Sequence, residues 1–217
     1  MTNPLPEPAA NAKFDYDRFF VNQKHMTLGK SKYYVYDEAG APLFYVERPV
    51  MRLFGRRGNI TIFDDDSART PVLELRQEQR YEFLRRDYTL VDAASGESLG
   101  RLLRSNWRSL FRRAWSVLGP DGAEVARARE DSALFAFLRR AIDFVPYVGI
   151  LGFALMRTNF HIFALQPDGG ELKVGEFNRK LSFGDKYVLD LEEDQARRLD
   201  RRVALALGIL LDTAEAR

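Results

Sequence analysis

A hairpin pattern that recurs five times along the chain is the feature that most constrains its fold. Each copy has a short β-type run, a turn rich in Asp, Gly, Ser or Pro, and a second β-type run. Asp37, Asp64, Asp92 and Asp121 follow one another at intervals of 27, 28 and 29 residues, the length of one hairpin and one return connection. About a dozen strands in series close into a barrel or fold into a sandwich. The predicted strand pairs are 33–36 with 43–46, 60–63 with 72–76, 88–91 with 99–103, 115–118 with 124–128, and 160–165 with 172–177.

The segment 194–213 is predicted to be a helix that is buried all round. It begins with charged residues and continues into nine consecutive apolar residues, Val203 to Leu211, which leave no polar face. Nine residues of helix are about 14 Å long, far short of a bilayer and close to the interior of a barrel. Ala204, Ala206 and Gly208 keep the helix slim. We therefore expect the last helix to fill a barrel made by the preceding strands.

The fold class predicted from these patterns is mainly β. It is a closed antiparallel barrel of about twelve strands around a buried C-terminal helix, with a helical insertion before the last strands. We expect residues 1–17 to form a disordered or extended lead and 18–217 a single domain. Within that domain, 131–157 is the helical insertion, because Leu134, Phe135, Leu138, Ile142 and Val145 recur every three or four residues before Pro146. The central helix is 194–213.

Composition excludes several classes of protein. The chain has no cysteine, so disulfides and cysteine-based zinc sites are excluded. Thirty-three basic residues against 31 acidic ones give a net charge of +2, too small for a general polyanion field, and we expect no nucleic-acid partner. The first eleven residues lack the features of a secretory signal, and no apolar run reaches the roughly 20 residues of a spanning helix. We expect a cytoplasmic protein that is peripheral to membranes.

Two parts of the chain resemble a known superfamily. The run 19–24 followed by 33–40 resembles the opening strands of the LURP-one-related and phospholipid scramblase branch of the tubby-like superfamily. The run 186–191, leading into the apolar helix, resembles the end of that branch. The resemblance covers about residues 19–212 and implies a twelve-stranded barrel around a buried helix. It also implies a link to membrane lipids, since tubby domains bind phosphoinositides and scramblases are named for lipid movement.

The scramblase likeness also raises the question of calcium. Scramblases carry a calcium-binding acidic segment before the final helix, and here Asp185 and Asp190 lie in the matching region. Asp190, Glu192, Glu193 and Asp194 have oxygen ligands suited to a hard cation. The alternating acidic pattern with a Gly for the turn is missing, however, and acidic residues before a helix also suit its N-terminal dipole. We favour capping and predict no metal site.

The sequence offers little for catalysis. The two histidines, His25 and His161, have no nucleophile motif beside them, and His161 lies in a predicted strand where a structural role is favoured. The run from Asp64 to Asp66 falls where the repeat requires a turn, so we favour turn chemistry over cation binding. We expect no catalytic residues, no cofactor and no enzymatic activity.

The candidate lipid-binding residues lie in and beside the insertion. Phe144 to Met156 is a run of 13 uncharged residues, flanked by arginines suited to anionic head groups. This run is interpreted as a cover for one barrel mouth or a homo-oligomer contact through 144–156, as a membrane contact, or as a ligand lid. The residues that we assign to lipid binding are Arg139, Arg140, Phe144, Tyr147, Ile150, Leu151, Phe153 and Arg157.

Two hypotheses for function follow. In the first, the protein is a non-enzymatic, scramblase-like barrel that associates peripherally with membranes or binds anionic phospholipid. That hypothesis predicts a basic rim and the run 144–156 on one face of the molecule. In the second, it is an intracellular scaffold or protein-interaction module with no lipid ligand.

Overall fold

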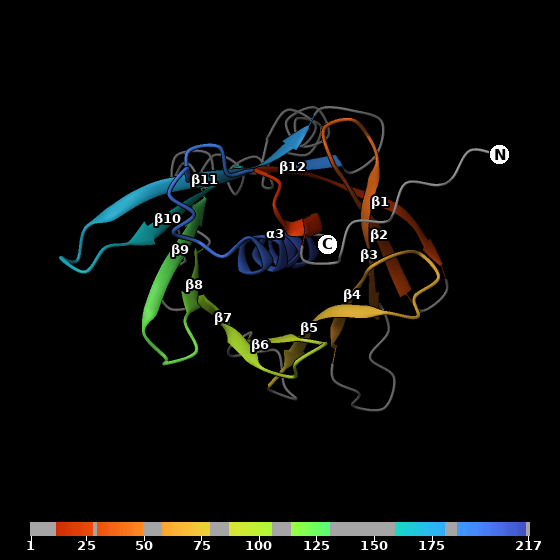
Figure 1. Ribbon diagram of the computed structural model, residues 1–217, viewed down its shortest axis with the longest axis horizontal. Helices are drawn as coiled ribbons and strands as arrows, with labels where there is room; N and C mark the ends of the chain where they lie inside the picture. The colour runs from red at the N-terminus through yellow and green to blue at the C-terminus, as the bar shows by residue number, and fades with distance from the viewer. Residues whose placement is uncertain are drawn as a thin grey trace, which may run out of the picture.

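The protein forms a closed antiparallel barrel of twelve strands, and in the part of the chain that the structure describes a single α-helix lies in its centre (Figure 1). The computed structural model describes residues 12–27, 30–49, 58–78, 87–105, 114–130, 159–180 and 186–215. Each strand pairs with its neighbours in sequence, and β1 pairs with β12 to close the barrel. The prediction of a mainly β, twelve-stranded closed barrel followed by a C-terminal helix is confirmed.

The strands match the predicted hairpins closely. Each predicted pair lies within an observed antiparallel ladder. The strands are β1 (Arg18–Thr27), β2 (Lys30–Tyr36), β3 (Pro42–Pro49), β4 (Ile60–Phe63), β5 (Pro71–Gln77), β6 (Asp87–Asp92), β7 (Ser98–Ser105), β8 (Ala114–Leu118), β9 (Glu124–Glu130), β10 (Asn159–Leu165), β11 (Glu171–Lys180) and β12 (Lys186–Asp190).

The turns between paired strands use the chemistry that the repeat predicted. An Asp carboxylate in each turn accepts a hydrogen bond from a backbone N–H a few residues later, which fixes the reversal. Asp65 accepts from Ser67 N at 2.8 Å, and Asp121 accepts from Ala123 N at 3.0 Å. The run from Asp64 to Asp66 is therefore a turn, as we favoured. The same bonds join Asp37 to Ala41 N, Asp92 to Ala94 N, and Asp168 to Gly170 N.

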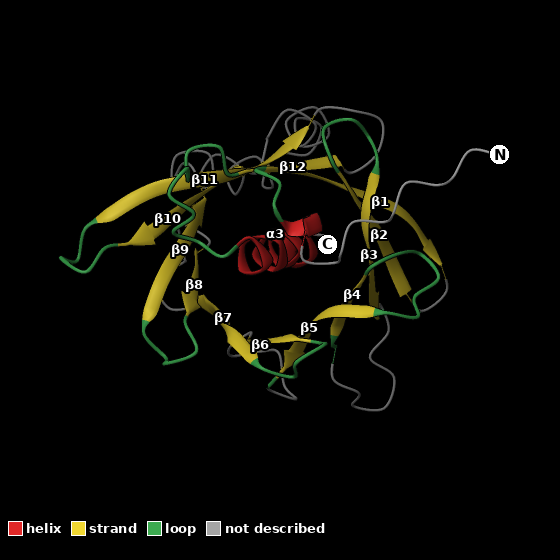
Figure 2. Cartoon of the chain, viewed as in Figure 1, coloured by secondary structure: helices red, strands yellow, loops and turns green. Residues whose placement is uncertain are grey.

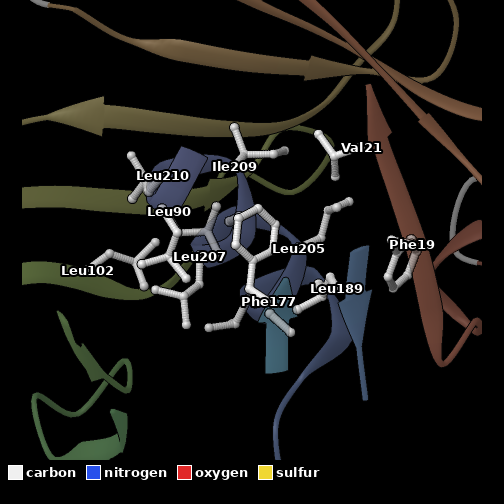
Figure 3. Close-up of a cluster of buried hydrophobic side chains, with 14 of the residues drawn as sticks. Phe19, Val21, Leu90, Leu102, Phe177, Leu189, Leu205, Leu207, Ile209 and Leu210 are labelled. Atoms are coloured by element: carbon white, nitrogen blue, oxygen red, sulfur yellow. The ribbon is translucent and has the colours of Figure 1, made fainter. Parts of the chain in front are cut away.

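Alternation along the strands builds the core. In β10, Phe160, Ile162 and Ala164 are buried while the residues between them are partly exposed, as the period of two in a strand requires. The inward side chains meet the helix α3 (Arg201–Glu215), which runs through the barrel (Figures 2 and 3). From Ala204 to Leu211 every side chain on that helix is at most 1 % exposed, and Gly208 is buried as well.

Two glycines permit close approach between backbone segments. A Cβ on Gly175 in β11 would lie 2.3 Å from the carbonyl oxygen of Asp190, so no larger residue fits there. A Cβ on Gly208 in α3 would lie 3.3 Å from the ring of Phe177, which therefore packs tightly on the helix. The helix and the barrel wall are thus in close contact at β11.

Two predicted boundaries differ from the structure. The helix begins at Arg201 and not at Asp194, because residues 194–200 form turns in which Arg197 has a φ of 49°. The predicted lead 1–17 is too long, because η1 (Ala12–Phe14) packs on the barrel and buries Phe14. Residues 1–11 and the whole of the predicted helical insertion 131–157 lie outside the described residues.

Within the described ranges, no helix has both the length and the apolar character needed to cross a membrane.

Candidate functional site

The two ends of the barrel differ sharply in charge. Because consecutive strands are antiparallel, alternate connections emerge at opposite ends of the barrel. One end, which we call the acidic end, comprises 12–17, 37–41, 64–70, 93–97, 119–123, 166–170 and 191–200. These segments hold fourteen acidic and four basic residues, a net charge of −10.

The sequences that join strands at the other end have the opposite charge. They are 28–29, 50–59, 78–86, 106–113, 131–158 and 181–185, and they hold twelve arginines against five acidic residues, a net charge of +7. We call this the arginine end. The strands β1, β3, β5, β7, β9 and β11 all finish there. The sequences that join the strands at the two ends of the barrel therefore differ in the sign of their net charge, and we call these two sets of connections the basic and the acidic pole.

At the acidic end, Asp194 organises the entry to the helix. Its carboxylate accepts hydrogen bonds from the backbone N–H groups of Arg198 (2.9 Å) and Leu199 (3.0 Å). It also lies 2.9 Å from a guanidinium nitrogen of Arg201, and the two side chains are 1 % and 4 % exposed. This buried ion pair fixes the turn before α3. The charged start of the predicted helix contained these residues, but no sequence pattern indicates that they pair.

The segment 12–17 crosses the same mouth of the barrel. Lys13 Nζ lies 2.7 Å from Asp64 Oδ1, and the ring of Phe14 stacks on Phe44 with centroids 4.5 Å apart. Asp15 pairs with Arg197, and Asp17 pairs with Arg201, each at 2.7 Å. The N-terminal segment is therefore attached to the barrel by one buried aromatic ring and three ion pairs.

A pocket of about 370 Å³ opens between this segment and the start of the helix. Its lining is Phe14, Asp15, Arg197, Leu199, Asp200, Arg201 and Arg202. Each of its three arginines already binds carboxylates of the chain itself. Arg197 pairs with Asp15, Arg201 with Asp17 and Asp194, and Arg202 with Asp92 and Asp200. Because those cations are already neutralised within an acidic surrounding, the pocket does not favour an anionic ligand.

Ion pairing also shifts the titration of two carboxyls beside this pocket. Hydrogen bonds from the backbone N–H groups of Ser95 and Ala94, together with the charge of Arg202, lower the pKa of Asp92. Burial acts to raise the pKa of Asp200, but hydrogen bonds from the side chain and backbone of Arg202 outweigh it and lower that pKa. Both carboxylates therefore favour the ionised state in the folded protein.

The acidic segment before the helix is engaged in ion pairs. Asp190 and Glu192 both bind Arg18, at 2.8 and 2.7 Å, and Glu193 binds Lys173 at 2.6 Å. Asp185 lies outside the described residues. Among those that are described, no three carboxylate or histidine side chains gather closely enough to hold a metal ion. The geometry of this segment is that of a pairing and capping region.

The residues that we assigned to lipid binding lie outside the described part of the chain. They are Arg139, Arg140, Phe144, Tyr147, Ile150, Leu151, Phe153 and Arg157, all within 131–158. His161 lies on the outer face of β10, where its Nδ1 is 3.7 Å from Glu176 Oε2. The strand β10 pairs with β9 and β11, so this histidine sits among charged neighbours on the barrel wall.

A buried polar cluster, which the sequence analysis missed, lies inside the barrel near the arginine end. Tyr33 is 1 % exposed and Asp212, near the end of α3, is also 1 % exposed. Burial raises the pKa of Tyr33 to about 12; the charge of Asp212 adds to the rise, and Arg48 opposes it. The alternation of side chains along β2 is the sequence signal that could have placed Tyr33 inside the barrel. Its polar neighbours, however, come from β3 and from the distant helix, which that signal does not reveal.

The topology of the sheet and the position of the helix define the class of protein: it is a twelve-stranded antiparallel barrel that is closed around its own C-terminal helix. The family model described as LURP-one-related matches residues 51–212. The chain therefore belongs to the LURP-one-related family, and the resemblance noted from its sequence is confirmed. No curated protein matches the chain in sequence.

Proposed function

We propose that this LURP-one-related barrel is a non-enzymatic, scramblase-like protein that binds anionic phospholipid surfaces peripherally through its arginine end. The observation that carries the proposal is the charge difference between the two poles, +7 and −10. The near-zero net charge of the whole chain conceals this difference. Attraction to an anionic surface then depends on orientation, because only one pole has the favourable sign.

The length of the barrel supports such an orientation. The fifteen residues of α3 span about 22 Å along the barrel interior. Charges are screened over about 8 Å at physiological salt, so the acidic pole is more than two screening lengths from a surface at the arginine end. Each Arg close to an anionic leaflet contributes about 1 kcal/mol. The favourable contribution of the near pole therefore outweighs the repulsion of the far pole.

Apolar residues at the same pole fit an interfacial contact. The connecting sequences there contain Trp107, Phe111 and the uncharged run 144–156 beside their arginines. Aromatic and apolar side chains enter the head-group region while arginines meet phosphate. This arrangement supports the expectation that the basic rim and the run 144–156 share one face.

The test is liposome co-sedimentation with neutral and anionic vesicles at low and high salt. We expect binding to anionic vesicles that weakens as salt increases. Replacing Arg108, Arg112 and Arg113 by Gln removes about 3 kcal/mol of attraction, roughly a 100-fold loss in affinity. The matched control replaces Arg69, Arg197 and Arg198, three charges at the acidic end, by Gln and leaves binding unchanged.

A second variant tests the apolar contribution. Changing Phe144, Ile150, Leu151 and Phe153 to Ser is expected to weaken binding to anionic vesicles at all salt concentrations. Circular dichroism and thermal unfolding establish that each variant is folded. If folded wild-type protein binds no vesicle, the proposal of lipid binding is wrong. The scaffold hypothesis, with a homo-oligomer contact through 144–156, then takes its place.

A further inference from the structure

Four polar side chains lie together on the outer face of two neighbouring strands, β10 and β11. In the antiparallel register of these strands, Asn159 faces Asn178 and His161 faces Glu176. Phe160, between the two residues on β10, is fully buried inside the barrel. Its neighbours on either side therefore lie on the outer face, as do their cross-strand partners. We call these four residues the amide–histidine cluster.

The cluster contains two buried amide oxygens that accept no hydrogen bond. Oδ1 of Asn159 and Oδ1 of Asn178 are both shielded from solvent, and neither has a donor among the residues that the structure describes. The orientation of the second amide is fixed, because its Nδ2 donates to Glu176 Oε1 at 2.6 Å. Buried carbonyl oxygens in proteins are nearly always satisfied by a donor group, a water or an ion. Both oxygens therefore have lone pairs available to a ligand.

The histidine and the glutamate are spaced as two ligands of one metal ion are. Nδ1 of His161 lies 3.7 Å from Oε2 of Glu176. That separation is longer than a hydrogen bond, whose donor and acceptor are about 2.7–3.2 Å apart. Zinc ligands lie about 2.1 Å from the ion, so two of them at a tetrahedral angle are about 3.4 Å from each other. A single ion can therefore bind both atoms after a small movement of either side chain.

Lys173 places a positive charge beside the glutamate. Its Nζ is 3.4 Å from Glu176 Oε2 and 2.6 Å from Glu193 Oε1. The shorter contact is the stronger one, so Lys173 keeps an ion-pair partner when a metal ion displaces it from Glu176. Its charge nevertheless opposes a second cation nearby. Removing that charge is therefore expected to strengthen metal binding at the cluster.

Arg129, the neighbour of His161 on β9, is directed away from the cluster. The two residues pair across the strands. The guanidinium of Arg129 binds the carboxylate of Glu171 and lies 4.5 Å from the centre of the Phe163 ring. Glu171 begins β11, whereas the cluster lies in the second half of that strand. The charge of Arg129 is therefore compensated at a different place on the barrel wall.

We propose that the amide–histidine cluster binds one divalent cation of the zinc class. The ligands are Nδ1 of His161, Oε2 of Glu176 and the amide oxygens of Asn159 and Asn178. Imidazole nitrogen suits zinc, whereas calcium and magnesium prefer sites made of oxygen alone, and four ligands complete the tetrahedral shell of a zinc ion. The ion joins β10 to β11 on the wall of the barrel. The proposal requires no lipid binding and uses no ligand from the acidic segment before α3.

Zinc titration of the full chain without an affinity tag tests the proposal. We expect isothermal titration calorimetry to show one zinc ion bound per chain, and no binding of magnesium under the same conditions. NMR of protein with isotope-labelled histidine reports the ring nitrogens of the chain's two histidines. Addition of zinc is expected to shift Nδ1 of His161 as a metal-bound nitrogen and to leave the ring of His25 unchanged.

Substitutions with opposite expected effects sharpen the test. Loss of a group that only orients a metal ligand costs about 10- to 100-fold in affinity, so removal of the nitrogen ligand in His161→Gln is expected to weaken zinc binding by about 100-fold or more. Lys173→Gln removes the opposing charge and is expected to tighten zinc binding several-fold. His25→Gln is the matched control, because it removes the other histidine and is expected to leave zinc affinity unchanged.

Circular dichroism and thermal unfolding establish that each of these variants is folded. Equal zinc affinity of the wild type and His161→Gln overturns the proposal, as does a wild-type protein that binds no zinc. Loss of zinc binding in His25→Gln, or coordination through Nε2 of His161, assigns zinc to a different site and also overturns it. Weaker zinc binding in Lys173→Gln contradicts the placement of the ion beside Glu176.

Discussion

At the scale of single residues, Arg201 holds together three parts of the chain that lie far apart in sequence. It pairs with Asp194 in the preceding turn and with Asp17 in the N-terminal segment, while its own backbone begins α3. Arg201→Gln leaves the buried carboxylate of Asp194 without its cation, so we expect a loss of about 3–5 kcal/mol in unfolding free energy. Urea denaturation measures it.

Arg197→Gln is the matched control, because its ion pair with Asp15 is solvent-exposed. The guanidinium is 46 % exposed and the carboxylate 72 %, so we expect a change of no more than about 1 kcal/mol. The double variant Arg201→Met, Asp194→Asn removes both buried charges and keeps an amide oxygen to accept from the backbone, so it is expected to recover part of the lost stability. Equal effects of Arg201→Gln and Arg197→Gln contradict the importance of the buried pair.

Tyr33 gives a second prediction at this scale. Its pKa is raised to about 12 from 10.0, chiefly by burial. The unfolded chain ionises this hydroxyl more readily, so its contribution to stability is present below pH 10 and is lost as the pH rises toward 12. Absorbance at alkaline pH, compared with Tyr33→Phe, is expected to show one tyrosine that ionises late. Ionisation of that tyrosine near pH 10 in folded protein would be inconsistent with its burial.

At the scale of secondary structure, α3 fills the barrel and its side chains form the centre of the core. Leu207 is fully buried among residues of several strands (Figure 3), and Leu207→Ala is expected to cost about 2–5 kcal/mol. Leu172→Ala, at a side chain that is 39 % exposed, is the matched control and should change stability by less than about 0.5 kcal/mol. Thermal or urea unfolding gives both values.

Local chemistry explains which elements were predictable. Asp–Gly turns and alternating strands are signals within a few residues, so the hairpins, their order and the late helix were read correctly. The helix start was misplaced because the carboxylate of Asp194 caps a turn and pairs with Arg201, a tertiary interaction that leaves no periodic trace. Phe14 was assigned to the lead because its partner, Phe44, lies thirty residues away on β3.

The candidate site was less accessible to sequence analysis than the fold. The arginines of the connecting sequences are evident in the sequence, but which of these connections share an end of the barrel follows only from a closed up-and-down topology. Likewise, the pairing of the mouth arginines with Asp15, Asp17 and Asp92 joins segments up to 184 residues apart. Residue types alone do not reveal such pairs.

At the scale of the whole molecule, the carboxylates with lowered pKa values predict the acid limit of stability. Folding lowers the pKa of Asp92 and Asp200 below 3.8 and that of Glu124, through hydrogen bonds from Arg127, below 4.5. A lowered folded-state pKa gives stability that is present above the unfolded value and is lost as the pH falls through the folded one. We therefore expect the unfolding free energy to decline below about pH 4.5.

Urea unfolding as a function of pH measures that decline. Asp92→Asn removes one titrating group and is expected to make the acid dependence shallower, with lower stability at neutral pH. Glu97→Gln, in the same turn, alters an exposed carboxyl and provides the comparison. A variant that retains the full acid slope would show that Asp92 does not contribute to it.

The pairing of β1 with β12 has a consequence for synthesis of the protein. Arg18 meets Asp190, a partner 172 residues later, and the helix that fills the interior follows that last strand. A growing chain can thus form its hairpins one by one but has neither a closed wall nor a filled core until β12 and α3 have been synthesised. Such a high contact order implies slow folding, and open strand edges and bare apolar faces persist on the nascent chain. Truncation before α3 removes the element that fills the barrel, and the ribosome-bound intermediate is the state in which chaperones are most needed.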